Sequence, residues 1–216
     1  MGAAVPKQYL PLAGRTVIEW SLVPFLQRER ISGIVVALAG SDERWPQTSL
    51  AGHESIITTI GGAERMNSVL AGLKALESRA AANDWVLVHD AARPCLSSAD
   101  LDRLLNELSG DEVGGLLAAP VVDTLKRADD DQRIAQTVPR EQLWRALTPQ
   151  MFRFELLRRA LLSAIHNGIS VTDEAQAVEA LGLRPKLIAG DADNMKITLP
   201  EDLPRAERIL RARSAA

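Results

Sequence analysis

Apolar runs of strand length alternate with segments of helical periodicity along this chain, and this alternation is the feature that most restricts its fold. Strands that alternate with helices build a mainly parallel sheet with helices on both faces. The periodicity predicts strands at 33–38, 55–60, 85–88, 114–122 and 185–188, and helices at 16–28, 63–77, 98–108, 153–166, 173–181 and 199–211. We therefore predict an α/β fold with a mostly parallel twisted sheet, and a length of 216 residues fits one domain.

Charge and cysteine content exclude several classes of function. The formal net charge is −3, so the chain has no excess of basic residues with which to bind nucleic acid. The apolar runs are shorter than the roughly 20 residues that span a membrane. Cys95 is the one cysteine, which rules out an intrachain disulfide and favours a reducing, cytoplasmic setting.

The segment 123–140 interrupts the alternation. It is rich in charge and has strand-like flanks at 124–126 and 134–137 around a polar tip. We interpret it as a protruding hairpin arm at about 121–142, with a solvated loop as the alternative. An isolated hairpin is marginally stable unless something packs on it, so an ordered arm would need a second subunit.

The segment Trp85–Pro94 combines a predicted strand with polar residues directly after it. In open α/β sheets ligands bind beyond the carboxyl ends of such strands, and Val86–Val88 is typical of a buried parallel strand. Asp90 is suited to a divalent metal or a sugar hydroxyl, Ala91 allows a ligand close to the backbone, and Arg93 is suited to a phosphate. We expect a binding site here.

Two further clusters lie earlier in the chain. Lys7 precedes the first predicted helix, and for a single lysine a solvated surface position is the more common role. Gly61 and Gly62 join a strand to a helix that carries Ser68, an arrangement that lets an anion approach the helix amino end. A plain strand-to-helix turn explains the glycines equally well.

Two clusters lie near the carboxyl end. Thr172 is predicted as the N-cap of the helix that begins near Asp173, and its hydroxyl is a candidate substrate ligand. Lys196 lies between apolar neighbours, which suggests a directed side chain and phosphate chemistry. The three histidines have no zinc-ligand spacing, and no nucleophile-elbow motif is present.

Together these clusters resemble the 2-C-methyl-D-erythritol 4-phosphate cytidylyltransferases of the non-mevalonate isoprenoid pathway. The resemblance spans nearly the whole chain. Its motifs are Pro6–Leu10, Gly61-Gly62 with Glu64-Arg65 and Ser68-Val69, Val88–Pro94, Asp123-Thr124, Leu147–Gln150, Thr172–Ala175 and Asp193–Lys196.

The resemblance implies a Rossmann-like nucleotidyltransferase fold, a homodimer, Mg²⁺ as cofactor, and CTP and methylerythritol phosphate as substrates. It implies that the substrate phosphate attacks the α-phosphorus of CTP in line, while the protein positions reactants and stabilises charge. The resemblance implies that Lys7 and Lys196 stabilise charge at the phosphorus and that Asp90 binds the metal and the substrate. It implies that the nucleotide is bound by Gly62, Ala63, Ser68 and Ala91. It also implies that methylerythritol is contacted by Arg93, Thr148 and Thr172, and its phosphate by Thr124 and Arg140 of the partner's arm.

Two departures from the family pattern are expected to matter. Members begin with a strand and a glycine-rich Ala-Ala-Gly-x-Gly-x-Arg-Met loop around the triphosphate, and Met1 aligns with the last residue of that loop, so we expect both to be absent from residues 1–216. Ala63 stands where the family often has Asp. The alternatives are a cytidylyltransferase for another polyol phosphate, such as ribitol 5-phosphate, and a catalytically inactive nucleotide-binding protein.

Overall fold

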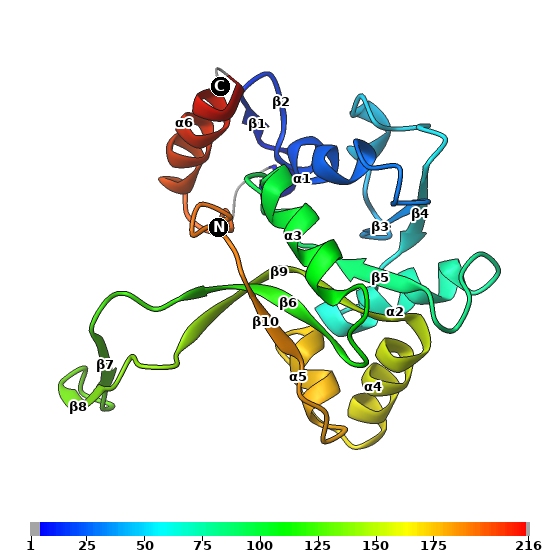
Figure 1. The fold of residues 1–216 in the computed structure, drawn as a ribbon. Helices are drawn as coiled ribbons and strands as arrows, with labels where there is room; N and C mark the ends of the chain where they lie inside the picture. Colours follow the sequence, from blue (N-terminus) through cyan, green and yellow to red (C-terminus); the bar gives the residue numbers. More distant parts are fainter. Residues whose placement is uncertain (1–4, 215–216) are drawn as a thin grey trace.

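The computed structural model describes residues 5–214, in which helices cover both faces of a mixed β-sheet (Figure 1). The expected α/β class is confirmed, while the expectation about Met1 lies outside the described residues. The helices are η1 (Lys7–Tyr9), α1 (Val17–Leu26), η2 (Trp45–Gln47), α2 (Arg65–Leu76), α3 (Ser98–Leu108), α4 (Phe154–His166), α5 (Glu174–Glu179) and α6 (Asp202–Ser214). The strands are β1 (Pro11–Leu12), β2 (Arg15–Thr16), β3 (Ile34–Leu38), β4 (Ile56–Ile60), β5 (Trp85–Val88), β6 (Gly114–Pro120), β7 (Leu125–Ala128), β8 (Ile134–Val138), β9 (Trp144–Arg153) and β10 (Lys186–Ala189).

The main sheet has the strand order β10-β6-β9-β5. β10 is parallel to β6, whereas β9 is antiparallel to both β6 and β5. β9 is a strand that the periodicity did not predict, because it contains Pro149 and places the polar Gln150 in the core. The expectation that Val86–Val88 forms a buried parallel strand is wrong: β5 pairs antiparallel with β9, and its residues are half-buried.

Side chains alternate between the two faces of this sheet, as the period of a strand requires. Leu116 and Phe152 face a core formed with α2, α4 and α5, whereas Leu117 and Met151 face a core formed with α3. Gly115 lies where β6 and β10 approach closely, since a Cβ atom there would be 2.1 Å from the carbonyl oxygen of Lys186. The two cores cover both faces of β6 and β9, and β9 pairs directly with β5, the strand that leads to Asp90.

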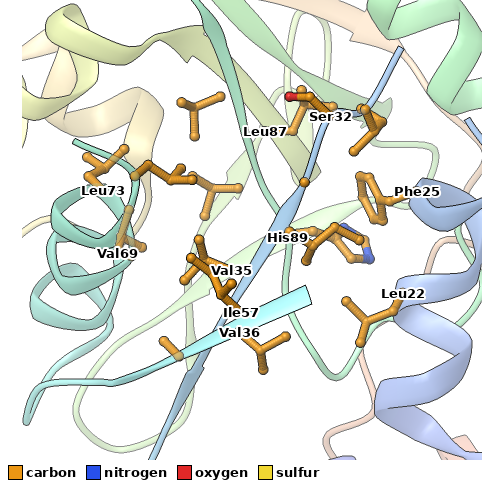
Figure 2. Close-up of a pocket in the computed structure, with 18 of the residues that line it drawn as sticks. Leu22, Phe25, Ser32, Val35, Val36, Ile57, Val69, Leu73, Leu87 and His89 are labelled. Atoms are coloured by element: carbon orange, nitrogen blue, oxygen red, sulfur yellow. The ribbon is translucent and has the colours of Figure 1, made fainter. Parts of the chain in front are cut away.

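β3 and β4 form a separate parallel pair that is not hydrogen-bonded to the main sheet. Between β3 and β5 lies a slot of about 770 Å³, lined by apolar residues of both strands and of α1 and α2 (Figure 2). Val36 and Leu87 face it from the strands, and Leu22 and Leu73 face it from the helices. Asp90 and Arg65 lie among its lining residues as well, so the slot connects with the polar region after β5.

The hairpin expected at 123–140 is present as the antiparallel pair β7 and β8. This arm extends away from the helices and the main sheet (Figure 1). Ile134 of the arm is 67% exposed and Val122 at its base is 71% exposed. The arm therefore presents apolar side chains to solvent within a single chain.

Candidate functional site

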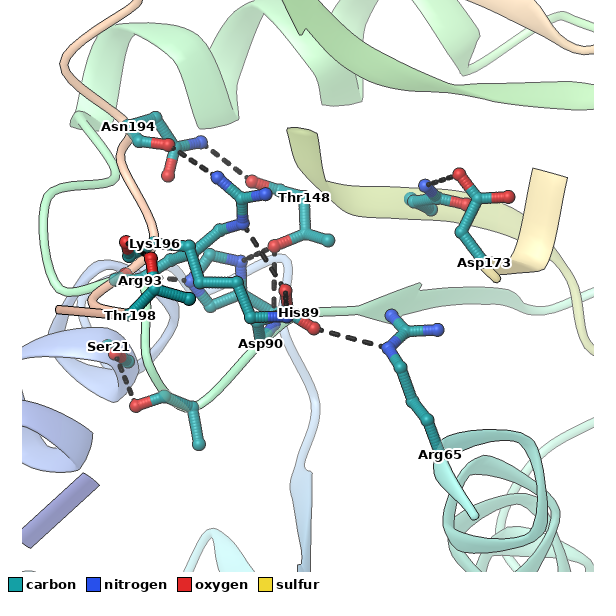
Figure 3. Close-up of polar contacts among 12 residues, drawn as sticks. Ser21, Arg65, His89, Asp90, Arg93, Thr148, Asp173, Asn194, Lys196 and Thr198 are labelled. Carbon is teal, nitrogen blue, oxygen red and sulfur yellow. Dashed lines mark hydrogen bonds and ion pairs between the residues drawn. The ribbon is translucent and has the colours of Figure 1, made fainter. Parts of the chain in front are cut away.

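Asp90 lies directly after β5, and three cationic side chains converge on its carboxylate (Figure 3). Lys196 Nζ lies 3.0 Å and Arg93 Nε 3.3 Å from Oδ2, while Arg65 Nε lies 3.3 Å from Oδ1. Burial disfavours the charged form, but Arg65, Lys196 and Arg93 outweigh it and lower the pKa of Asp90 to about 2. The carboxylate is ionised at neutral pH, and the surplus of positive charge around it suits an anionic ligand.

A buried network fixes the backbone on either side of Asp90. The Asp90 amide donates to Thr148 Oγ1 over 3.2 Å, and His89 Nε2 lies 3.1 Å from the carbonyl oxygen of Arg93. A carbonyl only accepts, so Nε2 carries the proton and Nδ1 accepts from the Thr148 hydroxyl, 2.9 Å away. Burial lowers the pKa of His89 to about 4, which keeps the ring neutral as this network requires.

Arg93 joins the Asp90 loop to the segment that carries Lys196. Its Nη1 donates to the carbonyl oxygen of Asn194 over 2.7 Å, and its side chain is 12% exposed. Asn194 in turn donates from Nδ2 to the carbonyl oxygen of Thr148 over 2.7 Å. These contacts aim Lys196, which is 40% exposed, at Asp90.

The glycine turn between β4 and α2 is closed by Ser68. The Gly62 amide donates to Ser68 Oγ over 3.1 Å. A Cβ atom at Gly62 would lie 2.3 Å from Cβ of Asn67, and one at Gly61 would lie 2.7 Å from Ser68 Oγ. A side chain at Gly62 would therefore collide with α2, whereas one at Gly61 would displace the Ser68 hydroxyl, and the exposed Ala63 follows them in the turn.

α5 begins beside the site, although its cap differs from the prediction. Asp173, and not Thr172, is the N-cap, because its carboxylate accepts from the Gln176 amide. Thr172 is one residue earlier, and its amide and hydroxyl both donate to Gln176 Oε1. Asp173 also accepts from Gln150 Nε2 over 2.9 Å, which ties the start of α5 to β9.

Among the other predicted residues, Lys7, Thr124 and Arg140 form no hydrogen bond or ion pair with Asp90 in the described part of the chain. Lys7 lies in η1 and is half-buried, and its side chain forms no ion pair with another residue of 5–214. Thr124 and Arg140 lie at the arm, where Arg140 donates to the carbonyl oxygen of Val122. Ala91 follows Asp90, and its carbonyl oxygen accepts from Ser21.

Sequence reasoning assigned no role to three residues of the site. Arg65 binds Asp90 and also forms a bidentate pair with Glu174, whose side chain is 1% exposed. His89 holds the backbone after β5 through its contacts with Arg93 and Thr148. Arg65, His89 and Glu174 all lie within motifs of the resemblance, but no spacing rule connects positions as distant as 65, 90 and 174.

Two findings concern ligands and membranes. Within residues 5–214, no group of three or more His, Cys, Asp or Glu side chains is placed to hold a metal ion. No helix in the described part of the chain is long and apolar enough to cross a membrane.

Comparison with known proteins gives one consistent result. A family model described as 2-C-methyl-D-erythritol 4-phosphate cytidylyltransferase matches residues 1–212. The protein of that name from Pseudomonas aeruginosa (strain UCBPP-PA14) is 56% identical over 209 residues, which cover 96% of this chain and 89% of the relative. The protein of that name from Azoarcus sp. (strain BH72) is 52% identical over 216 residues, 99% of this chain and 90% of the relative.

Solved structures agree with this similarity. A crystal structure of 4-diphosphocytidyl-2C-methyl-D-erythritol synthase superposes with a TM-score of 0.86 at 40% identity, covering 94% of both chains. The 2-C-methyl-D-erythritol 4-phosphate cytidylyltransferase from Thermus thermophilus has a TM-score of 0.81 at 35% identity, covering 95% of this chain and 94% of that one.

Proposed function

The chain belongs to the family of 2-C-methyl-D-erythritol 4-phosphate cytidylyltransferases, which makes it a nucleotidyltransferase, and we propose how its residues carry out the reaction. It transfers the cytidylyl group of CTP to 2-C-methyl-D-erythritol 4-phosphate in isoprenoid precursor biosynthesis. The products are 4-diphosphocytidyl-2-C-methyl-D-erythritol and pyrophosphate. The observation that carries the assignment is the meeting of Lys196, Arg93 and Arg65 at Asp90 in a chain that matches the family model over residues 1–212.

The chemical step needs positioning and positive charge. A phosphate oxygen of the acceptor bonds to the α-phosphorus of CTP while the bond from that phosphorus to the bridging oxygen breaks and pyrophosphate leaves. Negative charge increases on the oxygens around the phosphorus, and cations placed there stabilise the transition state. We assign this role to Lys196, which is partly exposed beside Asp90, and to Lys7.

The nucleotide is proposed to bind at the glycine turn. Gly62, Ala63 and Ser68 would read the cytosine, and Ala91 would lie against the ribose. The closure of the turn by Ser68 supports this proposal, because it holds backbone groups in a fixed arrangement where a planar base can bind. Ala63 has no polar side chain, so its backbone supplies any hydrogen bond to the base.

The methylerythritol moiety is assigned to Arg93, Thr148 and Thr172. Thr172 is exposed, and Arg93 and Thr148 lie in the network around Asp90. In this arrangement Arg93 and Thr148 act mainly by holding the walls of the acceptor site.

Magnesium fits this site as an ion that arrives with the triphosphate. Mg²⁺ keeps several waters and commonly binds one or two carboxylates together with substrate phosphates. Asp90 offers one such carboxylate, whose Oδ2 is bound by Lys196 and Arg93 in this structure and would be open to the ion on the side of Lys196 if that side chain moved to a substrate phosphate. When bound, the ion would supply positive charge that neutralises the phosphate oxygens.

We propose a homodimer in which the arm completes the site of the partner. Thr124 and Arg140 would contact the acceptor phosphate of the neighbouring subunit. The exposed Ile134 and Val122 support this proposal, because a second copy would cover them. We place the reaction in the cytoplasm, in keeping with the free, buried thiol of Cys95.

An assay of pyrophosphate release tests the assignment. CTP is compared with the other nucleoside triphosphates, and methylerythritol phosphate with ribitol 5-phosphate. Release that requires CTP and methylerythritol phosphate is expected. A preference for ribitol 5-phosphate would favour the sister activity, and CTP binding without release would favour the inactive nucleotide-binding protein.

A further inference from the structure

Arg65 and Glu174 form an ion pair that no step of the proposed reaction uses. Arg65 Nη1 binds Glu174 Oε1, and Nη2 lies 2.8 Å from Oε2, so the guanidinium grips both carboxylate oxygens. The Glu174 side chain is 1% exposed. The remaining guanidinium nitrogen, Nε, lies 3.3 Å from Asp90 Oδ1.

This guanidinium joins three segments that are distant in the sequence. Arg65 is the first residue of α2, directly after the glycine turn assigned to the nucleotide, and Glu174 is the first residue of α5, two residues after Thr172. Asp90 follows β5. A planar guanidinium with a fixed fork sets the relative position of all three, which a flexible ammonium group does not do.

The two oxygens of Asp90 thereby receive different partners. Oδ1 is bound by Arg65, whose other nitrogens are occupied by Glu174, whereas Oδ2 is bound by Lys196 and Arg93. Lys196 is 40% exposed and is anchored by no other side chain in residues 5–214. Lys196 is therefore the partner that is free to leave Asp90 for a phosphate.

We propose that Arg65, held by Glu174, is a positioning residue that fixes Oδ1 of Asp90 so that Oδ2 and Lys196 face the bound nucleotide. The inference rests on the proposed function and deepens it, because it assigns a task to two residues outside the implied catalytic set. Arg65 acts through Asp90 and makes no contact with the reacting phosphorus.

The test separates positioning from simple stabilisation. Arg65→Gln leaves the buried Glu174 carboxylate without its partner, and Glu174→Gln leaves the Arg65 guanidinium with Asp90 as its remaining partner. The double variant replaces the ion pair with two neutral amides that can bind each other. Thermal unfolding and steady-state kinetics are measured on the full chain for all three variants. Arg158→Gln with Glu155→Gln is the matched control, because this pair lies exposed on α4.

We expect each single variant to lower Tm and the double variant to regain most of the loss. We expect kcat to stay about 10²-fold below wild type in the double variant, because Asp90 is no longer fixed at Oδ1. KM for CTP should change much less than kcat, because the glycine turn keeps its own hydrogen bond between the Gly62 amide and Ser68 Oγ. Arg65→Lys keeps the charge without the fork and should regain only part of kcat, and the control pair should match wild type in both measurements.

The outcomes separate the inference from the function beneath it. Wild-type kcat in the double variant, at whatever Tm, would show that Arg65 does not position Asp90 for the reaction, and would overturn the inference while the activity stands. A wild-type protein that transfers no cytidylyl group would overturn the proposed function together with the inference built on it.

Discussion

The Asp90 cluster and the arm differ in what holds their polar side chains. Around Asp90, the side chains of Arg65, Arg93 and Thr148 are fixed by partners within the same chain. On the arm, Thr124 is exposed, and the one partner of the Arg140 side chain among residues 5–214 is the carbonyl oxygen of Val122 at the base. The comparison shows that contacts within one chain preorganise the side chains around Asp90 but not those of the arm, which is the difference expected if the arm acts on a second chain as proposed.

Lys196→Ala should have the largest effect. Loss of its ammonium group removes positive charge at the transferred phosphorus, and removal of one such electrostatic contact lowers kcat by about 10²- to 10³-fold. Pyrophosphate release under saturating substrates measures it, and circular dichroism checks that the fold is intact. Turnover within about twofold of wild type would refute the role given to Lys196.

Gly62→Ala should have the second largest effect on activity. The added Cβ would lie 2.3 Å from Cβ of Asn67, so the turn must move away from its hydrogen bond with Ser68. We expect kcat/KM for CTP to fall by about 10²-fold, the effect of displacing a binding group by about 1 Å. The matched control is Gly72→Ala in α2, where a Cβ meets nothing within 4 Å. An equal loss in both variants would contradict a local role for the turn.

Arg140→Ala tests the arm and should have a smaller effect on activity than the two variants near Asp90. A charge-assisted hydrogen bond contributes about 1.5 kcal/mol, so its loss should raise KM for methylerythritol phosphate by about tenfold with little change in kcat. KM for CTP is the internal control. Sedimentation that finds only monomer at assay concentrations would remove the basis of this prediction.

The sequence predicted the strands, helices and motifs that depend on local pattern. β5 and α3 lie at the predicted residues, and the helix predicted at 63–77 is present as α2, which buries Met66 and Leu73. β9 was missed because its burial is set by β5 and β6 on either side and not by alternation within the strand. Local periodicity carries no information on such a central strand when it contains proline and glutamine.

Only part of the site was predicted, because local sequence patterns do not show which distant residues come into contact. Asp90 and Lys196 were singled out by their neighbours in the sequence, and they meet in the structure. The pairing of Arg65 with Glu174 spans 109 positions, and only the packing of α2 and α5 into one core brings the two side chains together. Motifs indicate which residues matter, whereas partners across the fold decide which of them bind substrate and which hold the others in place.

Ile134→Ser should have the smallest effect on the stability of a single chain but should clearly weaken the proposed dimer. Ile134 is 67% exposed, so the free energy of unfolding of the monomer should change by no more than about 0.5 kcal/mol. Leu161→Ala, at a fully buried position of α4, should cost about 2–5 kcal/mol and is the stability reference. If a second copy covers the arm, Ile134→Ser weakens dimerisation and raises KM for the acceptor as Arg140→Ala does. Unchanged sedimentation with an unchanged KM would place the arm outside the interface, and the acceptor phosphate would then have to be bound by the chain that holds Asp90.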